Sequence, residues 1–228
     1  MNTMDARRFI LGLMLLVLIS AIPTNAQNEK SVSLGGHTFT ANLPDGWVVS
    51  SNMTIDSIDP SSSDWTDLKW SWKGVWAEAF NYPAYPSAPK DSDYYGTISG
   101  RVYLFVVKIP DDLRQQLLQH DVAVYGSSDK IPDDRKTQEL NDILTDAAHI
   151  SILNTKYDSE KDITFNDHQA HLSEADDSSW SIGSIAILLD NDTVGIIQPN
   201  IEKTHRLGKD SAIFDGSAWD FIEKVTVN

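Results

Sequence analysis

The side chains with the clearest potential for recognition chemistry form an aromatic block between residues 65 and 85. This block holds seven of the 21 Trp, Tyr and Phe residues of the 228-residue chain. Aromatic rings that alternate with Gly, Ser and Pro can form a platform for a sugar ring or the centre of a protein interface. The expected contact residues are Trp70, Trp72, Trp76, Tyr82 and Tyr85. The alternative is that these rings fill the core and anchor a long loop, because tryptophan is normally buried to a large degree.

A second candidate site is the acidic turn at residues 190–193. Asp190 and Asp192 flank Asn191, and their hard oxygens could bind Ca²⁺. The segment lacks the glycine and the distal glutamate of an EF-hand, and Asp and Asn in hairpin turns need no ion to explain them. Calcium is therefore the weaker interpretation, and we expect neither a structural metal nor a cofactor.

Histidine and serine give little support for catalysis. His168 and His171 are three positions apart in a segment that reads as a strand, where this spacing puts them on opposite faces. We therefore expect surface histidines and no shared metal. The chain has no Gly-x-Ser-x-Gly motif and no cysteine, so hydrolysis is the weakest of the functional interpretations and no enzymatic activity is expected.

Charge narrows the range of partners. Acidic residues outnumber basic ones 33 to 18, and the formal net charge is −15. A surface of this sign repels nucleic-acid backbones and anionic membranes, so we expect neither as a partner.

The N-terminus has the layout of a signal peptide. Arg7 and Arg8 precede an apolar run from Phe9 to Ile22, and Ala26 offers a small residue for cleavage. The run is shorter than the roughly 20 residues of a membrane-spanning helix, so no stable anchor is expected after cleavage. The sequence predicts a secreted, extracytoplasmic protein whose residues 27–228 form a single domain with an aromatic and proline-rich insert at about 65–97.

Hydrophobic periodicity predicts the elements that must position these side chains. Both faces of residues 102–107 are apolar, which is typical of a central strand covered on both sides. Residues 133–150 have apolar positions at helical spacing after Pro132. Segments 163–172, 180–189 and 194–198 read as strands. Residues 52–66 read as loop, and Gly74 as a turn.

These elements predict an α+β fold, an antiparallel β-sheet with helices packed on it. The segments that carry a family resemblance lie at the two ends, Gly35–Trp47 with its Pro-x-Gly-Trp turn and Phe214–Val225. The chain resembles the PsbP-like family, typified by the extrinsic subunit of photosystem II. The resemblance implies an α/β/α sandwich, export, and a non-catalytic role in protein binding or assembly.

Two functions are therefore expected from different classes. The first is a secreted, non-enzymatic domain that binds another protein or an assembly of the cell envelope. The alternative is an extracellular carbohydrate- or ligand-binding protein that uses the aromatic block at 65–85.

Export is directly testable. We expect cleavage after Ala26, because this residue closes the predicted signal peptide. The intact mass of the protein recovered after export should correspond to a chain that begins at Gln27. A mass that includes residues 1–26 would contradict the prediction.

Overall fold

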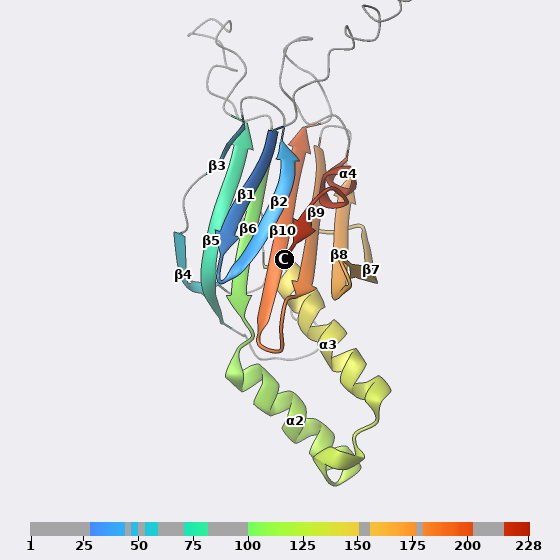
Figure 1. The fold of residues 1–228 in the computed structure, drawn as a ribbon. Helices are drawn as coiled ribbons and strands as arrows, with labels where there is room; N and C mark the ends of the chain where they lie inside the picture. Colours follow the sequence, from blue (N-terminus) through green and yellow to red (C-terminus); the bar gives the residue numbers. More distant parts are fainter. Residues whose placement is uncertain are drawn as a thin grey trace, which may run out of the picture.

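A computed structural model describes residues 28–43, 47–49, 53–58, 71–81, 100–150, 156–176, 180–202 and 217–228. The predicted signal peptide and most of the insert at 65–97 lie outside these residues. Within them the chain forms two antiparallel β-sheets, three α-helices and one short 3₁₀ helix (Figure 1). None of the described helices has the length and apolar run needed to cross a membrane.

The large sheet has eight strands. Two short strands pair with the same edge of one long strand. The other strands lie beyond the opposite edge of that long strand, each antiparallel to its neighbour. In spatial order they are β3 (Trp47–Val49) and β4 (Met53–Ile58), then β5 (Trp72–Asn81), β6 (Gly100–Lys108), β10 (Thr193–Glu202), β9 (Trp180–Leu188), β8 (His168–Asp176) and β7 (Ser159–Phe165).

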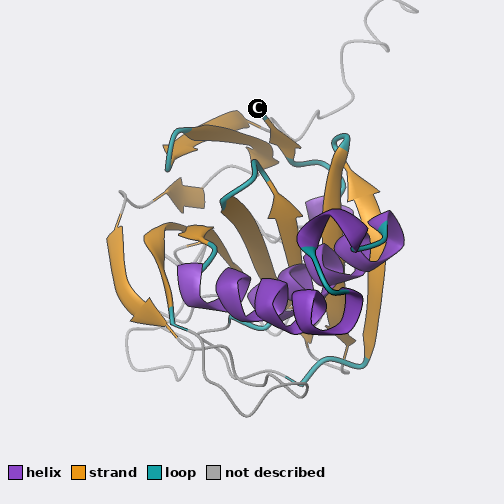
Figure 2. Ribbon diagram, turned by 90° about the horizontal axis from the view of Figure 1, so that it is seen from below, coloured by secondary structure: helices purple, strands orange, loops and turns teal. Residues whose placement is uncertain are grey.

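A small sheet covers one face of the large one. It contains β1 (Asn28–Leu34), β2 (His37–Leu43) and β11 (Thr226–Val227), with the short helix α4 (Ala218–Ile222) beside it. Helices α2 (Asp111–Tyr125) and α3 (Asp133–Ala148), joined through the 3₁₀ helix Ser128–Lys130, lie on the opposite side (Figure 2). The result is a layered structure in which the large sheet is the middle layer.

The expected fold class, α+β with helices packed on an antiparallel sheet as in a PsbP-like α/β/α sandwich, is wrong. Far more residues lie in strands than in helices, and one face of the large sheet is covered mainly by a second sheet. The expectation failed because the segments of β1 and β4 are short and polar, so the hydrophobic alternation that indicates a strand is weak in them. The fold is sheet-dominated.

Strand β6 is the central strand that its sequence predicts. Val102, Leu104 and Val106 belong to the core under the small sheet, whereas Tyr103 and Phe105 belong to a separate core under α2 and α3. Because neighbouring side chains of a strand point to opposite faces, an apolar run of this length needs cover on both sides.

Two tight turns connect the hairpins. Gly35 and Gly36, both at positive φ, join β1 to β2, and Asn166 and Asp167, also at positive φ, join β7 to β8. Asn, Asp and Gly tolerate this left-handed conformation, which matches the twist of paired strands. The segment 163–172, expected as one strand, is therefore divided between two strands by the Asn-Asp turn.

The expected turn at Gly74 is also absent. Gly74 lies inside the continuous strand β5, and a Cβ atom there would come within 2.1 Å of the carbonyl oxygen of Val106. Glycine is thus required by the close approach of two backbones. Likewise, residues 53–58 form strand β4 where a loop was expected.

Helix α3 agrees closely with its prediction. Asp133 and Asp134 lie in its first turn, where the helix dipole favours negative charge, and Ile143 and Leu144 are buried against the sheet. The turn between β9 and β10 lies at residues 189–192, one residue earlier than the expected 190–193.

Replacement of Leu144 by Asp should destabilise the fold. Leu144 is fully buried in the core under α3, so the change places an unpaired carboxylate in an apolar site at a cost of several kcal/mol, about 3–5. Thermal and urea unfolding measure the loss. The same change at the exposed Leu118 on α2 is the matched control, and equal stability of the two variants would contradict the assigned core.

Candidate functional site

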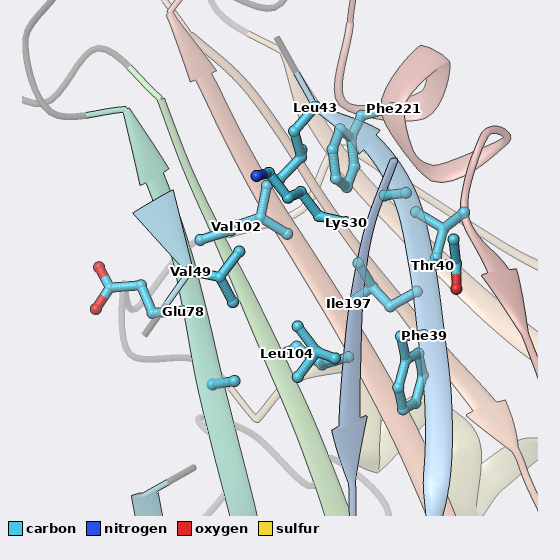
Figure 3. A pocket seen from close by; sticks show the side chains of 15 residues that line it. Lys30, Phe39, Thr40, Leu43, Val49, Glu78, Val102, Leu104, Ile197 and Phe221 are labelled. Carbon is cyan, nitrogen blue, oxygen red and sulfur yellow. The ribbon is translucent and has the colours of Figure 1, made fainter. Parts of the chain in front are cut away.

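An apolar pocket lies between the two sheets (Figure 3). Its enclosed space is about 60 Å³, and the whole hollow, with its open mouth, is about 480 Å³. The small sheet contributes one wall and β5 and β6 contribute most of the other, and Phe221 of α4 and Val225 also line the pocket. Its larger apolar side chains include Phe39, Leu43, Val102, Leu104, Ile197 and Phe221.

The space in this pocket arises from small side chains on facing strands. Ala41 lies on β2, and Ala77 and Ala79 lie on β5, at alternate positions that share one face. Packed sheets lie about 10 Å apart, so alanine leaves space that a leucine would fill. The alternation of Ala77 and Ala79 with larger residues is the sequence signal that could have indicated this pocket.

One cation lies at the pocket. Lys30 lies on β1 among the lining residues, and in Figure 3 its side chain extends across the pocket toward Val102. The nearest lining carboxylate is Glu78, whose side chain points away in the same view and pairs with Arg101 at 2.6 Å. No carboxylate of the described residues forms an ion pair with Lys30.

The predicted aromatic surface is divided by the structure. Trp70, Tyr82 and Tyr85 lie outside the described residues. Trp72 is completely buried in the core under α2 and α3, where no ligand from solvent can contact it. Trp76 is partly buried, with its ring 6.1 Å from both the Tyr103 and the Phe105 ring. The structure does not bring these five residues together as a set.

The carboxylates of the acidic turn contact other groups of the protein. The Asp190 carboxylate accepts a hydrogen bond from the Asp192 backbone N–H at 2.8 Å and lies 3.5 Å from His37. Asp192 pairs with Arg114 at 3.4 Å. Among the described residues, no group of three or more His, Cys, Asp or Glu side chains could hold a metal ion.

A band of polar side chains lies on the other face of the large sheet, under the C-terminal end of α3. The Ser184 hydroxyl donates to the Ala148 carbonyl at 2.7 Å, and the Gln198 amide donates to the Ile150 carbonyl and to Ser184. The last carbonyls of a helix have no partner within the helix. This band supplies partners and fixes the end of α3 on the sheet.

His171, expected at the surface, is only 6% exposed in this band. His171 and His168 point to opposite faces of the strand, as predicted. Helix α3 covers the face that carries His171 and buries its ring. Its Nδ1 donates to Asp162 at 2.8 Å, and Nε2 has no hydrogen-bond partner among the described residues. Nearby, His149 at the end of α3 pairs with Glu160 of β7. The His149–Glu160 pair joins α3 to the edge hairpin of the sheet, whereas the His171–Asp162 pair links the two strands of that hairpin.

The chemistry that the two regions can perform therefore differs. The inter-sheet pocket is lined mainly by apolar side chains, with Lys30 as its cation and with the Glu78 side chain pointing away, so its described residues suit the binding of an apolar ligand. The polar band contains His171, whose Nε2 has no hydrogen-bond partner among the described residues, and the carboxylates of Glu160 and Asp162 pair with His149 and His171.

Two buried carboxyls hold protons more strongly than usual. Burial raises the pKa of Asp146, in the last turn of α3, to about 6, although the Trp72 indole N–H and His149 oppose the rise. Burial and the adjacent Asp121 carboxylate raise the pKa of Glu139 to about 7, against the effect of Arg135. The Arg135 Nε–H lies 3.1 Å from both oxygens of Asp121, between α2 and α3.

Comparison with known proteins adds no identity: no family model, no curated protein and no solved structure matches this chain. The PsbP-like resemblance therefore stays a prediction.

The raised pKa values predict stability that is higher in mild acid. Asp146 and Glu139 keep their protons in the folded state at pH values where the unfolded chain releases them. The free energy of unfolding that these two protonated groups add is fully present below about pH 4. It is lost as the pH rises through 6 and 7. Urea unfolding should therefore give a larger free energy of unfolding at pH 5 than at pH 8.

The variant Asp146→Asn isolates one of these groups. Removal of the ionisable carboxyl should raise the free energy of unfolding by about 2 kcal/mol at pH 8 and change it little at pH 4.5. Asp133→Asn, at an exposed carboxylate, is the control. A variant that loses stability equally at both pH values would show that the Asp146 carboxylate is not the source of the pH dependence.

Proposed function

We propose that this chain is a non-catalytic binding domain that holds a small apolar ligand between its two sheets. The observation that carries the proposal is the pocket itself, an open apolar space that facing alanines leave within an otherwise close-packed core. Soluble ligand sites are typically concave, mostly apolar and supplied with few polar groups. This pocket has that composition.

The pocket favours an elongated aliphatic ligand over a sugar. Its walls are aliphatic and phenyl side chains, and the described lining offers few side-chain hydrogen-bond partners for hydroxyl groups. Burial of each methylene contributes about 0.8 kcal/mol, so a chain of eight buried methylenes gains about 6 kcal/mol before the costs of association. Binding in the range of tens of micromolar is a reasonable scale for such a ligand.

This proposal keeps the ligand-binding class expected from the sequence but moves its location from the aromatic block to the inter-sheet pocket. Export to the cell envelope and a role in binding another protein stay predictions. They are compatible with a pocket domain, because a binding module needs no catalytic group.

A methyl NMR titration with 1-decanol tests the proposal. The methyl signals of Leu104 and Ile197 should shift, because both line the pocket. Those of Leu113 and Ile143 should not, because they lie in the separate core under the helices. Shifts confined to Leu113 and Ile143, or no saturable shift at all, would contradict the proposal.

The variant Ala77→Leu supplies the matched test of location. A leucine side chain occupies space in the pocket and should abolish decanol binding while thermal unfolding stays cooperative. Ala79→Leu, at a partly exposed lining position, is the milder alternative if Ala77→Leu does not fold. Undiminished binding by a folded variant would place the ligand elsewhere.

A further inference from the structure

We infer that the ligand of the inter-sheet pocket carries a carboxylate at one end of a single aliphatic chain, and that Lys30 recognises this carboxylate. The inference rests on the proposed function and adds the chemical class of the ligand. It follows from the position of Lys30, from the ion pairing around it and from the narrowness of the space behind it.

The position of Lys30 is set by strand geometry. Lys30, Val32 and Leu34 alternate along β1, and this face of the strand points toward the large sheet. The outward face carries Ser31 and Ser33, whose hydroxyls lie close to Thr40 and Thr38 of β2. Lys30 is thus a cation at an inward position that lines the pocket and still contacts solvent, because the residue is exposed.

The ion pairing near the pocket leaves Lys30 available. The chain has 33 acidic residues and 18 basic ones, yet no described carboxylate forms an ion pair with Lys30. Arg101 engages Glu78, the carboxylate nearest to the lining, and also lies 5.5 Å from the centre of the Tyr103 ring on the other face of the sheet. The ammonium group is therefore free to form a charge-assisted hydrogen bond with a ligand carboxylate.

The shape of the pocket selects one slim chain. Its enclosed space is only about 60 Å³, and its lining includes the bulky side chains of Phe39 and Phe221. A ligand whose chain lies between the alanines would place its polar end at the open side, where Lys30 lies. A two-chain lipid would leave its second chain in water.

The protein's own charge does not prevent this recognition. Long-range repulsion from a net charge of −15 is screened over about 8 Å at 0.15 M salt, whereas a direct contact with the ammonium group is screened much less. Measurements at this ionic strength therefore report the local contact.

The experiment compares decanoate with 1-decanol, two probes that share a ten-carbon chain and differ at the head group. Dissociation constants are measured at pH 8 and 0.15 M salt, below the concentration at which either probe aggregates, from the Leu104 and Ile197 methyl shifts. The unmodified protein should bind decanoate about tenfold more tightly than decanol. Lys30→Met should remove this difference and leave the decanol affinity within about twofold.

The outcomes separate the two proposals. Equal binding of decanoate and decanol by the unmodified protein would overturn the carboxylate inference and leave the pocket function intact. Absence of binding by both probes would overturn both. Lys136→Met, on the exposed side of α3 and remote from the pocket, is the control and should keep the decanoate preference. Loss of the preference in this control would show that general surface charge is responsible.

Discussion

The arrangement of the molecule depends on the burial of β6 on both of its faces. An apolar strand in the middle of an eight-stranded antiparallel sheet exposes two hydrophobic surfaces, and neither can face water. The chain covers one with β1, β2, β11 and α4, and the other with α2 and α3. Two separate cores result, and the large sheet isolates them from each other. The apolar pocket lies under the first cover and the polar band under the second.

The two covers meet the sheet in different ways. Helix α3 is fixed by hydrogen bonds from Ser184 and Gln198 to its terminal carbonyls, so its position is specified by directional contacts. The small sheet is held over the same sheet mainly by apolar contacts, which are not directional, with the His37–Asp190 pair at one end. Small side chains can therefore leave a space under it without breaking a hydrogen-bond network. A binding site under the small sheet therefore destabilises the fold less than one under α3 would.

Local patterns predicted much of the chain, and non-local contacts account for what was missed. The apolar run of β6 and the helical spacing of α3 are signals within one segment, and both elements were predicted. Strand β1 was not predicted, because the role of Val32 and Leu34 depends on their contacts with β2 and the large sheet. Gly74 was misread because its reason, the Val106 carbonyl, is about thirty residues away. The pocket was not predicted, because the alternation of Ala77 and Ala79 indicates a space only once the packing of the two sheets places Ala41 in the same lining.

The small sheet joins distant parts of the chain. Strand β11 pairs with β2, and Thr38 and Asn228 exchange two backbone hydrogen bonds of 2.8 and 2.9 Å. Contacts of such high sequence separation form late, because a long loop must close before they contribute. A chain that enters a compartment with its N-terminus first must keep the edge of β2 unpaired until residues 226–227 follow. An unpaired edge is a template for association with another chain, so the kinetics of this last strand control the risk of aggregation.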